Sequence, residues 1–533
     1  MMTPERTSPL RIPSFALSLF MSSIVLVGCS ASGGGAVPPA STLGDLANPL
    51  EVRSSNGVAT LHLNAVLDPL TGAPAFAYQG SELAPTIRVN PGDTIDLTYE
   101  NDLPPSSSEP FNMTNLHFHG LTVSPNPPAD DAMLMAMPGQ SIHYSLRIPP
   151  EQPPGIYWYH PHAYGETNWQ VSNGMAGAII VEGVSSYVPQ LVGMRERVLI
   201  VRDSLIHSDF STLSKLKRIL SSKQVRLDSE PTLSACSSQP EENRTLTVND
   251  VATPTIGIAP GEKQFWRIVN AGAGRYLDLA VDGESIQLVS LDGVPLAAYP
   301  GNSVTQTVGH VLVPPAGRAE IIVTGESSGA ALRTLCFDSG PIGDPDPAAV
   351  LAILKSPTTA AATVTTSTTI VKPSVPGSKI GRVGILGSGN GAYSALPAPT
   401  TKRTITLSET SDGLSFFING QAFDMNAPPL FTAQSGTVEE WTVLNTTQEV
   451  HDFHIHQIHF VVEDVNGQSQ GPYRWVDTVN VPYQTISADG TTTPGEVKLL
   501  MDFRDPVIRG IFMFHCHILE HEDGGMMAKI AVQ

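Results

Sequence analysis

Cysteine, charged and aromatic residues are all scarce in this chain of 533 residues. Cysteine occurs only four times, so each one calls for its own explanation. Charged residues make up 15% of the chain, and acidic residues outnumber basic ones to give a net charge of −20. That sign argues against nucleic acid, and against an anionic membrane surface, as partners of the folded body. After the N-terminal region, no apolar run is long enough to span a membrane.

The abundant residues point to β-structure. The chain has 46 glycines and 45 prolines, and 41% of its residues are hydrophobic. Frequent turn residues among apolar ones favour many short strands joined by tight loops over long helices. The length exceeds what one hydrophobic core can organise and suggests about three or four domains.

The first 28 residues are typical of a bacterial lipoprotein signal peptide. A basic start is followed by an apolar run that is too short for a comfortable membrane-spanning helix and that ends just before Cys29. The implied processing places a lipid on Cys29 and leaves residues 29–42, rich in Ser, Gly, Ala and Pro, as a tether. We therefore expect an exported cell-envelope lipoprotein, periplasmic or anchored in the outer membrane. An ordinary signal peptide is the alternative, and export of either kind makes a disulfide between Cys236 and Cys336 possible.

A weak repeat divides the rest of the chain into three parts. Runs of alternating apolar and polar residues begin after Gly92, Gly261 and Gly436, and each run ends at an asparagine nine residues after its glycine. We interpret each copy as a glycine turn, one strand of a sandwich and an asparagine turn. Three copies predict an all-β chain of three β-sandwich domains. The expected ranges are domain one at 43–185, domain two at 191–356, a linker rich in Thr, Ser and Pro at 357–401, and domain three at 402–533.

Four His-x-His pairs occur among the 15 histidines, although random placement would produce fewer than one. The pairs are His117/His119, His160/His162, His454/His456 and His515/His517. Side chains at i and i+2 on a strand point to the same face, so each pair offers two imidazoles to one site. Imidazole suits copper, zinc, iron and nickel. The pattern therefore predicts a metal centre.

Cys516 lies between the two histidines of the last pair. On a strand its side chain faces away from both of them, so it would bind a different metal ion. One thiolate, two imidazoles and a weak thioether make a blue copper site. Cys516, His521 and Met526 supply three of these ligands, and His451 is the natural fourth. Zinc would need four strong ligands and has no use for a distant methionine.

Four motifs resemble those of the three-domain multicopper oxidases, the family of laccases, bilirubin oxidases and bacterial cuprous oxidases. They are residues 117–120 (HFHG), 158–162 (WYHPH), 451–456 (HDFHIH) and 515–526 (HCHILEHEDGGM). The match follows the family's order and covers essentially the whole chain after the signal peptide. The resemblance implies three cupredoxin-like Greek-key domains, four copper ions, O2 as electron acceptor, and a small-molecule reductant or Cu(I) as donor. A monomer is expected.

The resemblance also assigns the ligands. It places the type 2 copper on His117 and His454, one type 3 copper on His119, His160 and His517, the other on His162, His456 and His515, and the type 1 copper on His451, Cys516, His521 and Met526. Two neighbouring residues depart from the commonest pattern, with Asp452 in place of a frequent proline and Gln457 in place of a frequent glycine. We interpret His459, which has no place in these sets, as structural.

Domain two lacks such ligands. The offsets that lead from the domain-three asparagine to His454 and His456 lead in domain two to Leu279 and Val281. We therefore expect domain two to act as a spacer. Domain one has Pro161 where domain three has its cysteine, so only domain three is expected to hold type 1 copper.

Water formation at the cluster requires protons as well as electrons. The resemblance implies Glu522, directly after a type 1 ligand, as part of a proton relay. It also implies an acidic residue behind the ligands of the first motif, for which Asp130 and Asp131 are equal candidates.

Three functions remain open. The first is laccase-like oxidation of phenols, one electron at a time, coupled to four-electron reduction of O2 to water. The second is a periplasmic cuprous oxidase for copper tolerance, and Glu449, close to His451, is placed to meet either kind of substrate. The third is a non-catalytic envelope protein with the same fold, which predicts lost ligands, whereas none is missing.

Overall fold

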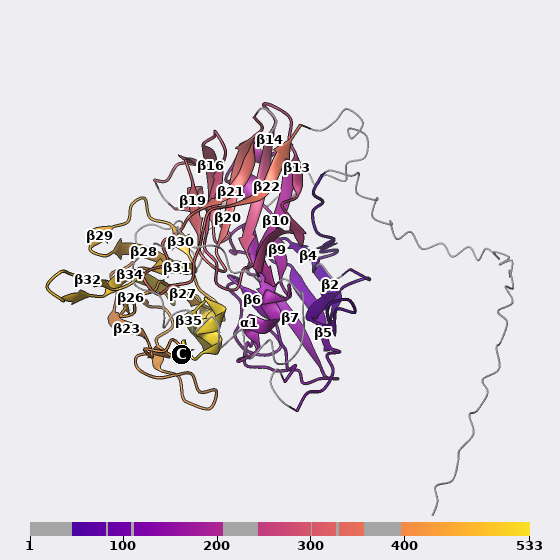
Figure 1. Cartoon of the computed structure of the whole chain (residues 1–533). Helices are drawn as coiled ribbons and strands as arrows, with labels where there is room; N and C mark the ends of the chain where they lie inside the picture. The colour runs from indigo at the N-terminus through magenta and orange to yellow at the C-terminus, as the bar shows by residue number, and fades with distance from the viewer. Residues whose placement is uncertain are drawn as a thin grey trace, which may run out of the picture. The chain divides into compact units, whose positions relative to one another are not determined.

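The computed structural model describes residues 45–81, 84–107, 111–205, 244–299, 301–326, 330–356 and 396–533. The expected signal peptide, the tether with Cys29, most of the 357–401 linker and Cys236 lie outside these residues. Nearly all of the regular secondary structure in the described chain is β-strand, so the all-β prediction is confirmed (Figure 1). Its helical elements are α1 (Thr167–Ser172), α3 (Leu519–Asp523), η1 (Val184–Ser186), η2 (Pro189–Leu191), η3 (Leu296–Ala298) and η4 (Pro506–Ile508). In the described part, no helix has the length and apolar character needed to cross a membrane.

Domain one is a sandwich of two sheets. One has the strand order β1-β4-β9-β8-β6 and the other β3-β2-β5-β7. The strands are β1 (Glu51–Arg53), β2 (Val58–Leu67), β3 (Pro74–Ala77), β4 (Thr86–Val89), β5 (Thr94–Asn101), β6 (His117–His119), β7 (Ser141–Arg147), β8 (Gly155–His160) and β9 (Gly177–Val181). Alternate side chains of β2 and β5 are buried in the core, as their sequence pattern predicts.

Domain two is a second sandwich, with strand orders β12-β11-β10-β14-β20-β16-β17 and β13-β22-β21-β15-β19, and with β18 paired to β16. The strands are β10 (Arg195–Leu205), β11 (Arg244–Val248), β12 (Val251–Ala252), β13 (Thr255–Gly257), β14 (Lys263–Asn270), β15 (Leu277–Val281), β16 (Ile286–Leu291), β17 (Val294–Pro295), β18 (Gln306–Val308), β19 (Val311–Val313), β20 (Arg318–Thr324), β21 (Ala331–Leu335) and β22 (Ala349–Lys355). Leu46, expected at the start of domain one, packs into this core. Cys336 is disulfide-bonded.

Domain three repeats the arrangement, with strand orders β24-β23-β26-β34-β28-β29 and β25-β36-β35-β27-β31, and with β30 paired to β28. The strands are β23 (Thr401–Glu409), β24 (Phe416–Ile418), β25 (Phe431–Ala433), β26 (Val438–Asn445), β27 (His451–Ile455), β28 (Phe460–Val465), β29 (Gln468–Ser469), β30 (Trp475–Val476), β31 (Thr478–Val481), β34 (Gly495–Asp502), β35 (Gly510–Cys516) and β36 (Met527–Val532), beside the hairpin of β32 (Thr485–Ile486) and β33 (Thr492–Thr493).

The three repeats occupy equivalent strands, β5, β14 and β26. Each runs parallel to an earlier strand and antiparallel to a later one in its own sheet. Each opening glycine has a positive φ, and each closing asparagine is buried, with its side-chain amide donating to main-chain carbonyl groups. The glycine and asparagine turns are therefore present as predicted.

Candidate functional site

Strand register brings the His-x-His pairs together. In domain one, β6 and β8 are antiparallel, and His117 lies opposite His160. In domain three, β27 and β35 are antiparallel, and His454 lies opposite His515. All of these pairs are buried. In each of these two domains, one sheet therefore supplies four imidazoles. They come from two neighbouring strands and from the residues that directly follow those strands.

The two sets of imidazoles meet. We call them together the eight-histidine cluster, which comprises His117, His119, His160, His162, His454, His456, His515 and His517. The Nε2 atom of His515 lies 3.3 Å from that of His162 and 3.2 Å from that of His456. The ring of His119 stacks on that of His454, with 3.8 Å between centroids. Domain one and domain three thus supply one shared site.

Two groups within the cluster have ligand atoms within 4.8 Å of one another. One is His162, His456 and His515, which the resemblance assigns to one type 3 copper. The other is His117, His454 and His456, which contains the pair assigned to the type 2 copper. The remaining set lies close by, because the ring of His517 is 5.1 Å from His119 and 5.3 Å from His160 between centroids.

Burial favours the neutral form of several cluster imidazoles by lowering their pKa values. Burial lowers the pKa of His162 to about 4; Glu522 opposes this shift, and His515 and His117 add to it. The pKa values of His119, His160 and His454 are likewise lowered, first by burial and then by nearby histidines. Neutral imidazole is the form that binds a metal ion.

Several buried ring nitrogens have no hydrogen-bond partner in the described part of the chain. These are Nε2 of His117, His119, His160, His454 and His517, and Nδ1 of His162, His456 and His517. Unsatisfied buried nitrogens are costly and rare. A converging set of them fits a cluster of copper ions, for which imidazole is a suitable ligand.

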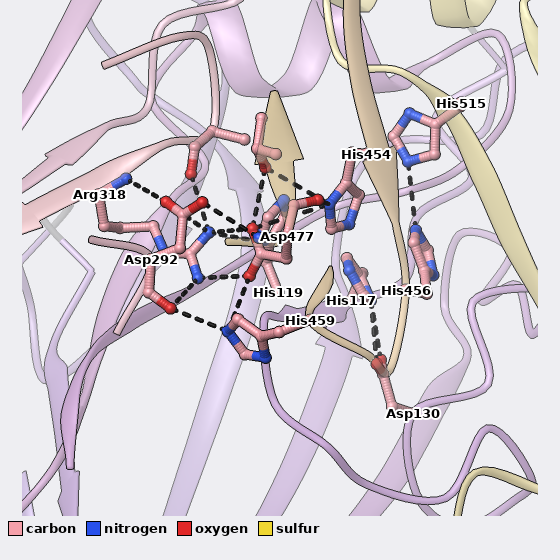
Figure 2. Close-up of polar contacts among 12 residues, drawn as sticks. His117, His119, Asp130, Asp292, Arg318, His454, His456, His459, Asp477 and His515 are labelled. Atoms are coloured by element: carbon pink, nitrogen blue, oxygen red, sulfur yellow. Dashed lines mark hydrogen bonds and ion pairs between the residues drawn. The ribbon is translucent and has the colours of Figure 1, made fainter. Parts of the chain in front are cut away.

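The outer nitrogens are held by the surrounding protein, which fixes the rings. His117 Nδ1 donates to Asp130 Oδ2 at 3.0 Å, as Figure 2 shows. Asp130 is buried, and it also accepts the Phe118 peptide N–H and the side-chain amide of Gln457. Asp131 accepts the peptide N–H of a nearby residue instead. Of the two candidate aspartates, Asp130 is the one in contact with a cluster histidine.

Glu522 lies at the other side of the cluster, on α3, and is fully buried. Its Oε2 atom is 3.1 Å from His515 Nδ1, and its Oε1 atom is 3.6 Å from His162 Nε2. The structure therefore brings together both the acidic group and the histidines that the resemblance implies.

A second group, which we call the thiolate site, consists of His451, Cys516 and His521. The Sγ atom of Cys516 is 3.8 Å from His451 Nδ1 and 3.6 Å from His521 Nδ1. Cys516 is free and buried, and burial raises the pKa of its thiol and lowers the pKa of His451 to about 3. Met526 is buried in the same core, and its carbonyl accepts the Cys516 peptide N–H. The thiol and the two imidazoles thus converge around one point.

Sequence reasoning missed one group of residues beside the cluster. Asp477 and Arg318 form a buried ion pair next to His119 and His454, and His459, expected to be structural, lies 3.5 Å from Asp477 (Figure 2). These residues are isolated in the sequence and share no spacing pattern, so no local signal marks them.

Comparisons with known proteins show to which family the chain belongs. Family profiles described as multicopper oxidase match residues 64–186, 212–329 and 396–533. The multicopper oxidase mco of Staphylococcus aureus is 24% identical over 468 residues, which cover 86% of this chain and 83% of that protein. The cell division protein FtsP of Escherichia coli (strain K12) is 28% identical over 476 residues, which cover 87% and 86%.

A solved structure supports the fold. The multicopper oxidase from Campylobacter jejuni, described as a metallo-oxidase, superposes with a TM-score of 0.66 at 22% identity and covers 92% of this chain and 95% of its own. The three sandwiches are thus cupredoxin-like. Because profiles of one family match all three domains in turn, this chain belongs to the multicopper oxidases.

Proposed function

We propose that this protein is a laccase-like copper oxidase that takes electrons singly from a phenolic or similar reductant and reduces O2 to water. The observation that carries the proposal is the position of Cys516. Its Sγ atom faces His451 and His521, while the adjacent residues His515 and His517 place their rings in the eight-histidine cluster. One short covalent path therefore joins the two sites. Copper ions held at these sites would supply the one-electron redox chemistry.

The chain's acidic groups have distinct roles in this proposal. Asp130 orients His117 by accepting its outer proton. Glu522 faces His515 and His162 from within the buried region, where its carboxylate is placed to accept a proton and pass it to the cluster. Burial of all these side chains keeps bulk water away from the site.

Glu449 favours a second candidate function, the oxidation of Cu(I). Its Oε1 atom is 3.3 Å from Nε2 of His521, on the side of that ring away from Cys516. Both side chains are buried, and the negative charge that Glu449 places beside this ring favours a cation that approaches His521. A cuprous oxidase and a laccase would thus use the same copper ligands and differ in the electron donor that approaches His521.

Oxygen uptake by the copper-loaded protein tests both candidates, with Cu(I) and a methoxyphenol as separate donors. A blue absorption band with fast phenol turnover supports the laccase, and strong uptake with Cu(I) alone supports the cuprous oxidase. Absence of a blue band after full copper loading would refute the proposal.

The Glu449→Gln variant sharpens the choice of substrate. Glutamine keeps the shape but removes the charge, so Cu(I)-driven uptake should fall by about fivefold, equivalent to roughly 1 kcal/mol of attraction. Turnover of a neutral phenol should change little. Equal rates in wild type and variant on both donors would contradict a substrate role for Glu449.

A non-catalytic envelope role is the alternative of another class, since a relative is named for cell division. Such a role gives no reason to keep buried, unpartnered imidazoles in two domains, whereas every ligand implied by the resemblance is present. Export and lipid attachment at Cys29 belong to the proposal too, and that cysteine lies outside the described residues.

A further inference from the structure

A buried ion pair between domains two and three lies against the eight-histidine cluster. Arg318, at the start of β20 in domain two, contacts both carboxylate oxygens of Asp477, which directly precedes β31 in domain three. The Nη1–Oδ1 distance is 2.6 Å and the Nη2–Oδ2 distance is 2.5 Å (Figure 2). Both side chains are fully buried. We call this pair the Arg318–Asp477 bridge.

The bridge holds the outer nitrogens of two cluster histidines. The carbonyl oxygen of Asp477 accepts from His454 Nδ1 at 2.8 Å. Arg318 Nη1 lies 3.2 Å from His119 Nδ1, and Asp477 Oδ1 is 3.9 Å from the Nδ1 atoms of both histidines. The Nε2 atom of His454, which lacks a partner, is thereby left for a metal ion. The Nε2 atom of His119 also lacks a partner; when it binds a metal ion the ring proton lies on Nδ1, and the carboxylate nearest to that proton is Asp477.

Asp292 of domain two hydrogen-bonds both residues of the bridge. Asp292 accepts the Arg318 peptide N–H through Oδ1 and a guanidinium N–H through its carbonyl oxygen, at 2.9 and 3.0 Å. Its Oδ2 atom accepts the peptide N–H of Asp477 at 3.1 Å. His459 donates to the Asp292 carbonyl at 2.9 Å. Because Asp292 contacts both partners, the guanidinium and the carboxylate are held in one relative position.

The bridge leaves no room for a side chain at the glycine of the first domain-one motif. Gly120 directly follows His119 and has a φ of +85°. A Cβ atom there would overlap Nη2 of Arg318 and would lie 2.7 Å from Oδ2 of Asp477. Domain one therefore leaves space at its histidine motif for a guanidinium that comes from domain two.

We propose that Arg318 is a positioning residue of the metal centre: by fixing Asp477 it sets the rings of His119 and His454, so domain two is part of the centre. This inference rests on the proposed copper function. It goes beyond the expectation that domain two is a spacer, because the three domains meet at this one guanidinium.

The chain offers a matched control for the effects of removing a buried arginine. Arg267, on β14 of domain two, is as deeply buried as Arg318 and is paired with Glu196 and Glu320, which also belong to domain two. In the described structure its polar contacts are with Glu196 and Glu320, and none involves a cluster histidine. Removing either arginine leaves a buried carboxylate without its guanidinium, Asp477 in one case and Glu320 in the other, which costs about 3–5 kcal/mol. Glu196 keeps its second partner, Arg88 of domain one, so the contact between domains one and two remains in Arg267→Met. Only the loss of Arg318 should disturb the cluster.

The experiment compares full-length, copper-loaded Arg318→Met and Arg267→Met with wild type. The measurements are copper per chain, the blue band and the electron paramagnetic resonance signal of type 2 copper. Arg318→Met should keep the blue band, because the thiolate site lies within domain three, but should retain cluster copper about 10–100-fold more weakly and lose or alter the type 2 signal. Arg267→Met should keep both signals. A wild-type type 2 signal and copper content in Arg318→Met, or equal copper loss in Arg267→Met, would overturn the inference.

Arg318→Lys decides the matter if Arg318→Met does not fold. Lysine keeps the charge but cannot make the two-point contact with Asp477. An altered type 2 signal beside an unchanged blue band supports the inference, and an unchanged type 2 signal overturns it. If wild type bound no copper, the proposed function and this inference would fail together, whereas wild-type signals in the Arg318 variants overturn the inference alone.

Discussion

The thiolate site and the eight-histidine cluster are both buried, yet they are built in different ways. The thiolate site takes His451, Cys516 and His521 from one domain, on β27, β35 and α3. The cluster takes histidines from domains one and three and contacts Arg318 of domain two. The first site therefore depends on the folding of one sandwich, and the second on the docking of three.

Polar contacts between buried groups dock the domains. Arg88 of domain one pairs with Glu196 of domain two at 2.8 Å, and both side chains are buried. Asp523, on α3 of domain three, accepts the peptide N–H groups of Gly165 and Asn168 in domain one at 2.9 and 2.8 Å. Because such contacts depend on correct partners, damage to docking should reach the cluster before it reaches the thiolate site.

Cys516→Ser should have the largest effect and should separate the two sites. A serine hydroxyl is not the soft thiolate that a blue copper site requires, so the blue band and substrate oxidation should disappear completely. Copper content should fall by about one ion per chain, and the type 2 signal should persist because the cluster histidines are untouched. Visible and electron paramagnetic resonance spectra with a metal assay check this. A blue band in the variant would mean that the thiolate site is wrongly assigned.

Asp130→Ala should weaken the cluster alone. It leaves the buried His117 Nδ1, the Phe118 N–H and the Gln457 amide without their acceptor. Loss of a partner behind a ligand costs about 10–100-fold in metal affinity or activity, so cluster copper should be retained that much more weakly while the blue band stays.

Asp131→Ala is the matched control for this substitution. Its carboxylate caps a turn through the Met133 peptide N–H and contacts no cluster histidine in the described structure. Copper retention should equal that of wild type. Equal losses in the Asp130 and Asp131 variants, measured as copper per chain after dialysis against a chelator, would contradict the distinction between them.

The same contrast explains what the sequence predicts well. Strand alternation sends His515 and His517 to one face and Cys516 to the other, so the linkage of the two sites follows from spacing alone. The glycine-to-asparagine repeat likewise marks equivalent strands, because each feature is set by neighbours in the chain. Local rules are sufficient for these elements.

Patterns among neighbouring residues do not predict contacts between domains. Arg318 and Asp477 are far apart in the sequence, and nothing near either residue identifies its partner. Asp130 and Asp131 are chemically identical neighbours, and only the fold of their loop turns one toward His117. The contacts between domains at the centre therefore required the structure, whereas the proposed ligands could be named from the sequence and its resemblance to the family.

The smallest expected effect concerns the thiolate site alone. The peptide N–H of Asp452 donates to Cys516 Sγ at 3.4 Å. This hydrogen bond and one from the Ile518 peptide both lower the pKa of the Cys516 thiol, against the effect of burial. Hydrogen bonds to the cysteine sulfur tune the reduction potential of a blue copper site. A donor that stabilises the thiolate reduces its electron donation to copper and so raises the potential. Asp452→Pro has no N–H, and its potential should be lower than that of wild type.

Asp452→Ala is the control, since it removes the carboxyl group and keeps the peptide N–H. Its potential should lie close to that of wild type, so the difference between the alanine and proline variants isolates one hydrogen bond. A redox titration that follows the blue band measures both. Because the change lies within domain three, the type 2 signal should be the same in both variants. If the proline variant kept the wild-type potential, the N–H group of Asp452 would have no part in tuning the site, and the buried carboxyl group would be the remaining feature to test there.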